Sequence, residues 1–179
     1  RLYIKNVPIL YSPYLGFSAD KTRRTGLLIP TLGFSTGEGL YYSQPIFYAP
    51  ALNYDFELVP QIRTTRGYGS YLYYRYADSQ DSILEMKTGI FKEQDDYVID
   101  NSLDSDLHYG FDLDYQKRNI FAKSSKAQDG LYTSINYLND VEYITLENDD
   151  TTTSTDSEVE SKINDVYNTN DYYTGVYGR

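Results

Sequence analysis

The feature that most constrains this chain is a hydrophobic pattern with a period of two. Successive side chains of a β-strand point to opposite faces of a sheet, so this pattern separates two faces. In residues 107–116, one face would carry Leu107, Tyr109, Phe111, Leu113 and Tyr115, and the other His108, Gly110, Asp112, Asp114 and Gln116. Two carboxylates on one face would be costly in an apolar core but cost little when they face water. The pattern therefore predicts a sheet with one apolar face and one wetted face.

The same alternation recurs along the chain and predicts an all-β fold of antiparallel strands. The clearest predicted strands are 54–63, 70–76, 83–91, 107–116 and 131–137, and the weaker ones are 27–34, 40–48, 119–124, 141–147 and 172–177. Most are close to the roughly 9–11 residues that a tilted strand needs to cross a bilayer. We therefore expect the strands to form part of a transmembrane β-barrel that is larger than this chain.

The predicted connections differ in length and composition. Residues 49–53, 78–81, 116–119 and 138–140 form short connections, whereas 93–103 and 148–165 are long and acidic. The range 148–165 has too few apolar residues to fold alone and is expected to be an exposed loop. Short turns at one end and long loops at the other are typical of an outer-membrane barrel, although the loops 35–39 and 65–69 are short. A soluble β-sandwich has no reason to sort its loops in this way.

The composition narrows the class of function. The 22 Tyr and 7 Phe residues favour strands. No run approaches the roughly 18 consecutive apolar residues of a membrane helix. A formal net charge of -10 argues against a nucleic-acid partner, and the absence of Cys removes any disulfide framework or Cys-based zinc site. The chain starts at Arg1 without a signal peptide, and its last residues resemble the middle of a strand, so we expect a segment of a longer protein.

The sequence offers no catalytic constellation. His108 is the one His, and its neighbours Asp106, Asp112 and Asp114 could pair with it, but no nucleophile elbow or zinc motif accompanies it. We therefore interpret His108 as a polar residue of the wetted face. The acidic run over 95–106 lacks the spacing of an EF-hand and is interpreted as a solvated loop. The sequence thus predicts no enzyme, no cofactor and no metal site. The polar residues expected to face the barrel lumen are Asp55, Glu57, Arg63, Arg75, Asp112 and Asp114.

Two predicted strands each contain a proline, Pro30 in 27–34 and Pro45 in 40–48. Proline has no N–H to give to a ladder and is normally confined to edges, strand starts and bulges. A closed barrel has no edge, so prolines on two consecutive strands indicate a seam that pairs poorly. The alternative is that each proline merely starts a strand or marks a bulge. Both interpretations remain open from the sequence.

A basic cluster of Lys21, Arg23 and Arg24 stands directly before the first predicted barrel strand of an acidic chain. One interpretation is an anchor at the rim of the barrel. The other is a contact for the phosphate groups of a passing lipid, because Arg can bind phosphate through two parallel hydrogen bonds.

Five short motifs follow one another in the first part of the chain. They are VPILYSPY at 7–14, RRTGLLIP at 23–30, PIFY at 45–48, NYD at 53–55 and RG at 66–67. In this order and with these gaps, the series resembles the LptD family of lipopolysaccharide-assembly proteins, formerly called organic-solvent-tolerance proteins. The resemblance covers residues 2–76 and then fades. The PIFY motif lacks the Trp of the family pattern, and the family's disulfide cysteines are not in this chain.

The resemblance implies a large outer-membrane β-barrel fused to a periplasmic β-jelly roll. Residues 1–15 would be the last strand of the jelly roll, 16–26 a hinge, and 27–179 the N-terminal part of the barrel. Lipopolysaccharide would leave for the outer leaflet through a lateral gate at the first barrel strands. The implied gate residues are Pro30 and Pro45, and the implied hinge and phosphate contacts are Lys21, Arg23, Arg24 and Gly26. The implied partners are lipopolysaccharide, outer-membrane lipid, a lipoprotein plug, LptE, and a periplasmic bridge of the LptA type.

Two other functions fit parts of the pattern. A general diffusion porin would share the barrel but would conduct ions through an open, acidic lumen. A soluble β-sandwich module could bind carbohydrate with its many Tyr rings. Single-channel conductance would distinguish the first, and solubility without detergent the second.

Overall fold

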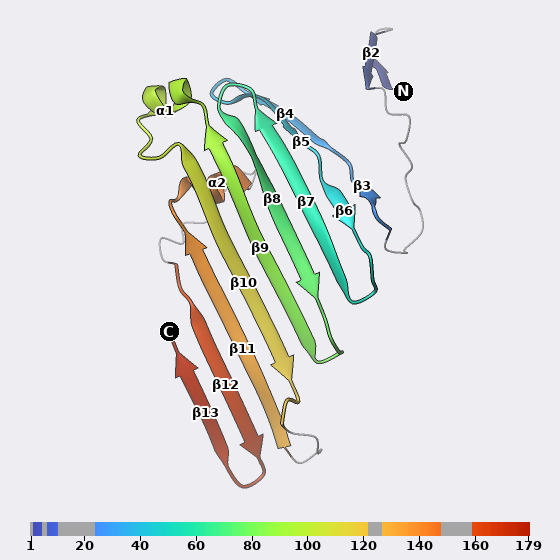
Figure 1. The fold of residues 1–179 in the computed structure, drawn as a ribbon, viewed down its shortest axis with the longest axis vertical. Helices are drawn as coiled ribbons and strands as arrows, with labels where there is room; N and C mark the ends of the chain where they lie inside the picture. Colours follow the sequence, from blue (N-terminus) through green and yellow to red (C-terminus); the bar gives the residue numbers. More distant parts are fainter. Residues whose placement is uncertain (1, 5–6, 11–23, 122–126, 148–158) are drawn as a thin grey trace.

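The fold is all-β and antiparallel, as the alternation predicts (Figure 1). The computed structural model describes residues 2–4, 7–10, 24–121, 127–147 and 159–179. Strands β1 (Leu2–Ile4) and β2 (Val7–Leu10) pair with each other. The other eleven strands form one sheet. In chain order they are β3 (Gly26–Leu27), β4 (Thr31–Ser35), β5 (Gly39–Ser43), β6 (Ile46–Tyr48), β7 (Tyr54–Arg63), β8 (Gly67–Tyr76), β9 (Ser82–Glu93), β10 (Leu107–Arg118), β11 (Ala127–Leu138), β12 (Lys162–Thr169) and β13 (Tyr173–Gly178).

From β7 to β13, strands that are neighbours in the chain lie side by side in this sheet. The order runs β13, β12, β11, β10, β9, β8, β7, β5, β4, while β3 pairs with β6 and β6 pairs with β7. Strands β3 and β4 therefore lie along one edge of the sheet, and β13 lies along the other (Figure 1). Over the residues that the structure describes, the sheet is open at both edges.

Most of the predicted strands are confirmed, and two are wrong. The five clearest predictions correspond to β7 to β11, and 172–177 corresponds to β13. The ranges 27–34 and 40–48 are each divided into two strands, one break at Pro30 and the other at Pro45. The prediction of a strand at 119–124 is wrong over its described part, because Asn119 takes a left-handed φ of 56° and ends β10. Residues 122–124 lie outside the described residues.

The predicted strand at 141–147 is wrong, because these residues form helix α2 (Glu142–Glu147). Tyr143 and Leu146, three residues apart, share one face of this helix and are both buried. The carboxylate of Asp140 accepts a hydrogen bond from the backbone N–H of Tyr143, as an N-cap does. The connection that was predicted to end at 140 therefore continues through α2 to β12. A second helix, α1 (Asp95–Asn101), occupies the connection predicted at 93–103, and β12 takes up residues 162–165 of the loop predicted at 148–165.

Direct pairing across the ladders sorts the side chains of the sheet onto two faces. We call them the polar face and the apolar face. The polar face carries Asp55, Arg75, Glu85, Asp114 and Ser134, which are joined in a row by the pairs Asp55↔Arg75, Arg75↔Glu85, Glu85↔Asp114 and Asp114↔Ser134. The apolar face includes Leu58, Ile90, Ile135 and Val176, whose side chains are 41%, 51%, 43% and 69% exposed. No described residue covers this apolar face as a second layer would.

The buried core lies on the other side of the sheet, between the polar face and α2. It consists of Tyr71, Phe91, Tyr143 and Leu146, and the rings of Tyr71 and Tyr143 lie 5.5 Å apart. Gly110 makes room for this packing, because a Cβ there would lie 2.4 Å from the Tyr143 ring. Helix α2 thus covers one end of the polar face, whereas the rest of that face remains open.

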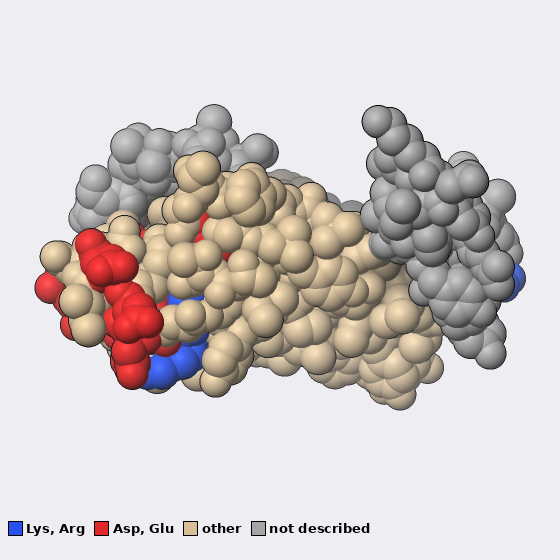
Figure 2. Space-filling view, turned by 90° about the horizontal axis from the view of Figure 1, so that it is seen from above, with Lys and Arg blue, Asp and Glu red and all other residues tan. Residues whose placement is uncertain are grey.

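Charged side chains are unevenly placed on the molecule. In the view from above, acidic side chains gather at one side, with basic ones beside them (Figure 2). Helix α1, which begins with Asp95 and Asp96, lies at this end of the sheet (Figure 1). Neither α1 nor α2, the two helices of the described ranges, is long and apolar enough to cross a membrane. The domain boundaries at 15 and 26 fall outside the described residues or are not tested by them, and they stay predictions.

Candidate functional site

The first candidate site is the break that divides the first two predicted barrel strands. Leu27 pairs with Ile46, and Thr31 pairs with Ser43. Between these two pairs the chain advances four residues from Leu27 to Thr31 but only three from Ser43 to Ile46. One extra residue on one of two paired strands is a β-bulge. Pro30 lies in this bulge, and the bulge interpretation of Pro30 is therefore correct. A bulge also disrupts the ladder locally, so the two interpretations offered by the sequence do not exclude each other.

Pro45 removes one hydrogen bond from the pairing between β3 and β6. The N–H of Leu28 donates to the carbonyl of Pro45 at 2.9 Å. Residues in such an antiparallel pair normally exchange two N–H···O bonds, but Pro45 has no N–H to return. The same loss recurs one strand further on. Gln44 donates its N–H to the carbonyl of Pro60 at 3.1 Å, and Pro60 has no N–H to return.

Three prolines spaced fifteen residues apart therefore lie next to one another across the sheet, because the strands run back and forth. We call Leu28, Pro30, Gln44, Pro45 and Pro60 the proline seam. Pro60 lies inside the predicted strand 54–63, and its place in the seam was missed from the sequence. The equal spacing of Pro30, Pro45 and Pro60 was the signal that could have found it.

The seam lies at the edge of the described sheet and its borders are apolar. Leu27, Ile29 and Phe34 are 69%, 67% and 77% exposed. Strand β3 has only two residues and β6 only three, so few backbone bonds hold this edge. A short, bulged edge with apolar side chains is suited to contact with lipid rather than with water.

Of the predicted hinge residues, Lys21 and Arg23 lie outside the described residues. Arg24 is exposed just before β3, and Gly26 is the first residue of β3. Thr25, between them, accepts a hydrogen bond on its hydroxyl from the N–H of Ala49 at 3.0 Å and so joins the start of β3 to the end of β6. A contact between Arg24 and lipid phosphate stays a prediction.

The second candidate site is the open part of the polar face, where five of the six predicted lumen residues come together. They line one hollow of about 350 Å³: Asp55, Glu57, Arg75, Asp112 and Asp114. Asp55 is buried and pairs with the guanidinium of Arg75 at 2.9 Å, and Lys87 pairs with Asp112 at 2.7 Å. The sixth residue, Arg63, lies on the same face but is buried beneath α2 instead of lining the hollow.

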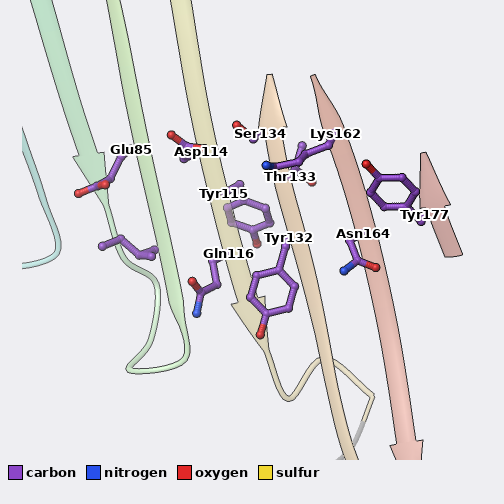
Figure 3. A pocket seen from close by; sticks show the side chains of 11 residues that line it. Glu85, Asp114, Tyr115, Gln116, Tyr132, Thr133, Ser134, Lys162, Asn164 and Tyr177 are labelled. Carbon is purple, nitrogen blue, oxygen red and sulfur yellow. The ribbon is translucent and has the colours of Figure 1, made fainter. Parts of the chain in front are cut away.

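A second hollow, of about 330 Å³, adjoins the first (Figure 3). Tyr132 and Tyr177 present rings there, and Gln116 and Asn164 present amides. Glu85 and Asp114 line both hollows, so the two form a continuous polar and aromatic surface across β7 to β13. Within the described ranges, no group of three or more His, Cys, Asp or Glu side chains is arranged to hold a metal ion.

The covered end of the polar face contains a cluster of ion pairs around Arg66. Its guanidinium contacts Glu38 at 2.7 Å, Glu93 at 2.8 Å and Glu142 at 2.6 Å. It also lies 5.1 Å from the centre of the Tyr97 ring. We call Glu38, Arg63, Arg66, Glu93 and Glu142 the rim cluster, in which Arg63 pairs with Glu38. These residues come from two turns, from the ends of β7 and β9 and from α2, so the rim cluster joins the β4–β5 turn to α2.

Backbone groups of α2 are also held by the sheet. Gln61 and Arg63 of β7 both donate to the carbonyl of Leu146 at 3.0 Å. His108 is buried beneath α2 and lies 2.7 Å from the carboxylate of Asp140, on the connection to α2. The sequence placed His108 on a face toward water and named only Asp106, Asp112 and Asp114 as neighbours that could pair with it. Two residues that pair with it were missed: Asp140, which the pairing of β10 with β11 carries toward His108, and Glu93 of β9, whose carboxylate lies 3.2 Å from its Nε2.

The rim cluster is expected to loosen in acid. Partial burial would raise the pKa of Glu38, but the hydrogen bonds and charges of Arg66 and Arg63 outweigh it and hold that pKa below its ordinary value of 4.5. A carboxyl whose pKa is lowered by folding stabilises the fold above its unfolded pKa, and this contribution is lost as the pH falls through the folded pKa. The ion pairs of Glu38 should therefore persist at pH 4.5 and be lost below it.

A spin label at Gly37, where an added Cβ meets no atom within 4 Å, would report the mobility of the β4–β5 turn in the full protein. The label should become mobile as the pH falls below the ordinary pKa of Glu38, and a Glu38→Gln variant should be mobile throughout. A turn that stays equally immobile in both proteins at every pH would show that Glu38 does not hold it.

These features define a class of protein. The sheet is antiparallel, its strands from β7 to β13 each pair with the next in the chain, and it has an exposed apolar face and a polar face with paired charges. This is the arrangement of strands in the wall of a large β-barrel. No family model matches the chain.

Curated relatives make the assignment more specific. The LPS-assembly protein LptD of Mannheimia succiniciproducens is 32% identical over 160 residues, which are 87% of this chain and 19% of that protein. LptD of Haemophilus influenzae (strain Rd) is 42% identical over 79 residues, 44% of this chain and 10% of that protein. LptD of Bordetella pertussis is 47% identical over 66 residues, 37% of this chain and 8% of that protein. The chain belongs to the LptD family and spans a fifth or less of the length of these relatives.

Proposed function

We propose that this chain is the N-terminal part of an outer-membrane β-barrel that delivers lipopolysaccharide to the outer leaflet, and that the lipid leaves through the proline seam. The relatives are named LPS-assembly proteins, which supports the cargo. The observation that carries the route is the pair of incomplete hydrogen-bond exchanges, Leu28 with Pro45 and Gln44 with Pro60. Backbone pairing is weakest where two neighbouring strands each lack a donor, so the barrel wall parts there at the lowest cost.

The two faces of the sheet support the same function. The apolar face exposes large side chains to its surroundings, as a lipid-facing wall does. The polar face carries amides, hydroxyls and paired charges that suit the sugar and phosphate groups of the cargo. On this proposal the acyl chains pass through the seam while the polar part of the lipid remains on the polar face.

The remaining parts of the proposal rest on membership of the family. Residues 1–15 end a periplasmic jelly roll that receives lipid from an LptA-type bridge, and 16–26 form the hinge to the barrel. Lys21, Arg23 and Arg24 contact lipid phosphates at this entrance. A lipoprotein plug, LptE, occupies the lumen of the complete barrel. The protein moves and inserts its cargo and makes or breaks no bond, so it is not an enzyme.

The seam is tested by restoring the missing donors in the full protein. A Pro30→Ala/Pro45→Ala double variant should release lipopolysaccharide to the cell surface more slowly, because the new N–H of residue 45 can donate to Leu28. One added hydrogen bond contributes about 1 kcal/mol, so we expect roughly a fivefold slower appearance of labelled lipopolysaccharide at the surface.

Pro50→Ala is the matched control, because Pro50 lies in the turn 49–53 outside every strand and its replacement should change nothing. Unchanged surface lipopolysaccharide in the double variant would contradict a route through the seam. The rival functions give different results: an open porin would show large single-channel conductance. A soluble carbohydrate-binding module would need no detergent, which is hard to reconcile with the exposed apolar face.

A further inference from the structure

We propose that the side-chain amide of Gln44 is a latch that closes the proline seam by supplying the donor that Pro45 lacks. This inference rests on the proposed function for its consequence, lipid release, but not for its geometry. Gln44 is a positioning residue on this proposal: it holds two backbone segments together and need not touch the cargo.

The side chain of Gln44 donates a hydrogen bond to the carbonyl that would accept the bond Pro45 cannot make. Leu28 donates its N–H to Pro45, and a residue other than proline would return an N–H to the carbonyl of Leu28. The Nε2 of Gln44 donates to that same carbonyl at 2.9 Å. It also lies 3.1 Å from the carbonyl of Pro45. The side chain of one residue thus takes the place of the backbone N–H of the next.

The orientation of the amide is fixed from its other end. The hydroxyl of Tyr42 donates to the Oε1 of Gln44 at 3.1 Å, so the Nε2 is the atom that faces the two carbonyls. Tyr42 and Gln44 are two residues apart on paired backbone and therefore share a face. Both ends of the amide are occupied, as expected of a polar group held in an apolar surrounding.

The position of Gln44 is otherwise unexplained. Its partner across the ladder is Pro60, and the flanking pairs are Tyr42 with Ile62 and Ile46 with Leu58, all on the apolar face. An amide among these side chains would be costly at membrane depth unless its hydrogen bonds were satisfied inside the protein. The bond to Leu28 is what makes a polar residue tolerable there.

A side-chain latch differs from a backbone bond in how it opens. The Gln44 amide can rotate away about its own side-chain bonds and gain rotamer freedom, whereas a backbone N–H is released only when the strand moves. The seam can therefore open at Leu28 while β5 keeps its pairing with β7. The rim cluster holds the far end of the β4–β5 hairpin through Glu38, so opening would proceed from the end of β3.

A double-mutant cycle in the full protein tests the latch. Gln44→Ala should speed hydrogen exchange of the backbone amides in 27–29 by roughly fivefold, because the pairing loses one of its two bonds. In a Pro45→Ala background, residue 45 supplies its own N–H, and Gln44→Ala should then change the exchange by less than about twofold. Gln128→Ala in β11, a glutamine in the same sheet without a neighbouring proline, is the matched control and should leave 27–29 unchanged.

Two results would overturn the latch: exchange of 27–29 that does not respond to Gln44→Ala, or an equal response with and without Pro45. Gln44→Leu, which keeps the bulk and suits the apolar face, should reproduce the effect of Gln44→Ala, and this variant excludes a packing defect. Surface delivery of lipopolysaccharide is measured in the same variants. Faster hydrogen exchange together with faster delivery of lipopolysaccharide supports both proposals. Faster hydrogen exchange with unchanged delivery supports the latch and contradicts a lipid route through the seam.

Discussion

Replacement of Arg66 by alanine is expected to release α2 from the polar face. The Arg66 side chain is only 6% exposed and contacts three carboxylates, one of which, on Glu93, is fully buried. Removing one member of a buried ion pair leaves the other charge unpaired and typically costs about 3–5 kcal/mol. A helix of six residues is not stable by itself, so α2 depends on its contacts with the sheet. The backbone amides of 140–147 should therefore exchange almost as fast as in an unstructured peptide.

Arg75→Ala is the matched control for this prediction. Arg75 lies near the far end of β8 from Arg66, pairs with Asp55 and has a side chain that is 54% exposed. The ion pair of Arg75 joins β8 to β7 and not the sheet to α2, so whatever its loss costs at Asp55, Arg75→Ala should leave α2 protected. Arg66→Lys should give an intermediate result, because a Lys ammonium lacks the planar fork that reaches several carboxylates. Unchanged protection of 140–147 in Arg66→Ala would mean that Tyr143 and Leu146 hold the helix without the rim cluster.

Strands could be predicted from the sequence where one face is apolar and the other polar along the whole strand. Strands β7 to β11 all alternate over many residues, so the pattern located them even though their ends shifted by a few residues. The alternation fails as a guide in short segments. Residues 141–147 alternate only weakly, and Tyr143 and Leu146 are three residues apart, so the contact of both with the core favours the helix.

The candidate sites were predictable in part, for a related reason. Pro30 and Pro45 can be named from the sequence because proline carries its own backbone restriction. Pro60 and Gln44 could not be assigned to the seam without the pairing register, which decides that Gln44 lies opposite Pro60 and beside Leu28. The rim cluster could not be predicted from the pairing register alone, because Arg66 and Glu142 are far apart in the chain and meet only when α2 folds onto the sheet.

The motif at 66–67 illustrates how one short signal can contain two separate structural demands. From the sequence, Arg66 and Gly67 are only one of a series of motifs, and neither residue has a role. In the structure, Arg66 holds the rim cluster together. Gly67 begins β8 and meets β9 at its last residue, Glu93, directly beside that cluster.

Gly67→Ala is accordingly expected to impair folding of the barrel wall. A Cβ at Gly67 would lie 2.1 Å from the backbone carbonyl oxygen of Lys92 and 3.0 Å from the Cα of Glu93. Overpacking against movable side chains costs about 1–3 kcal/mol, and here the obstacle is backbone, so the cost should be at the upper end or beyond. Strands β8 and β9 would have to separate where Glu93 pairs with Arg66, which would weaken the rim cluster as well.

The measurement is the fraction of the full protein that is folded, read from its mobility on gels without boiling. Gly67→Ala should lower this fraction severalfold. Gly37→Ala makes the same substitution in the β4–β5 turn, where a Cβ meets no atom within 4 Å, and should fold normally. Normal folding of Gly67→Ala would show that β8 and β9 can part by the required distance at little cost. The rim cluster would then have to tolerate that shift, because Arg66 is bonded to both the turn and the end of β9.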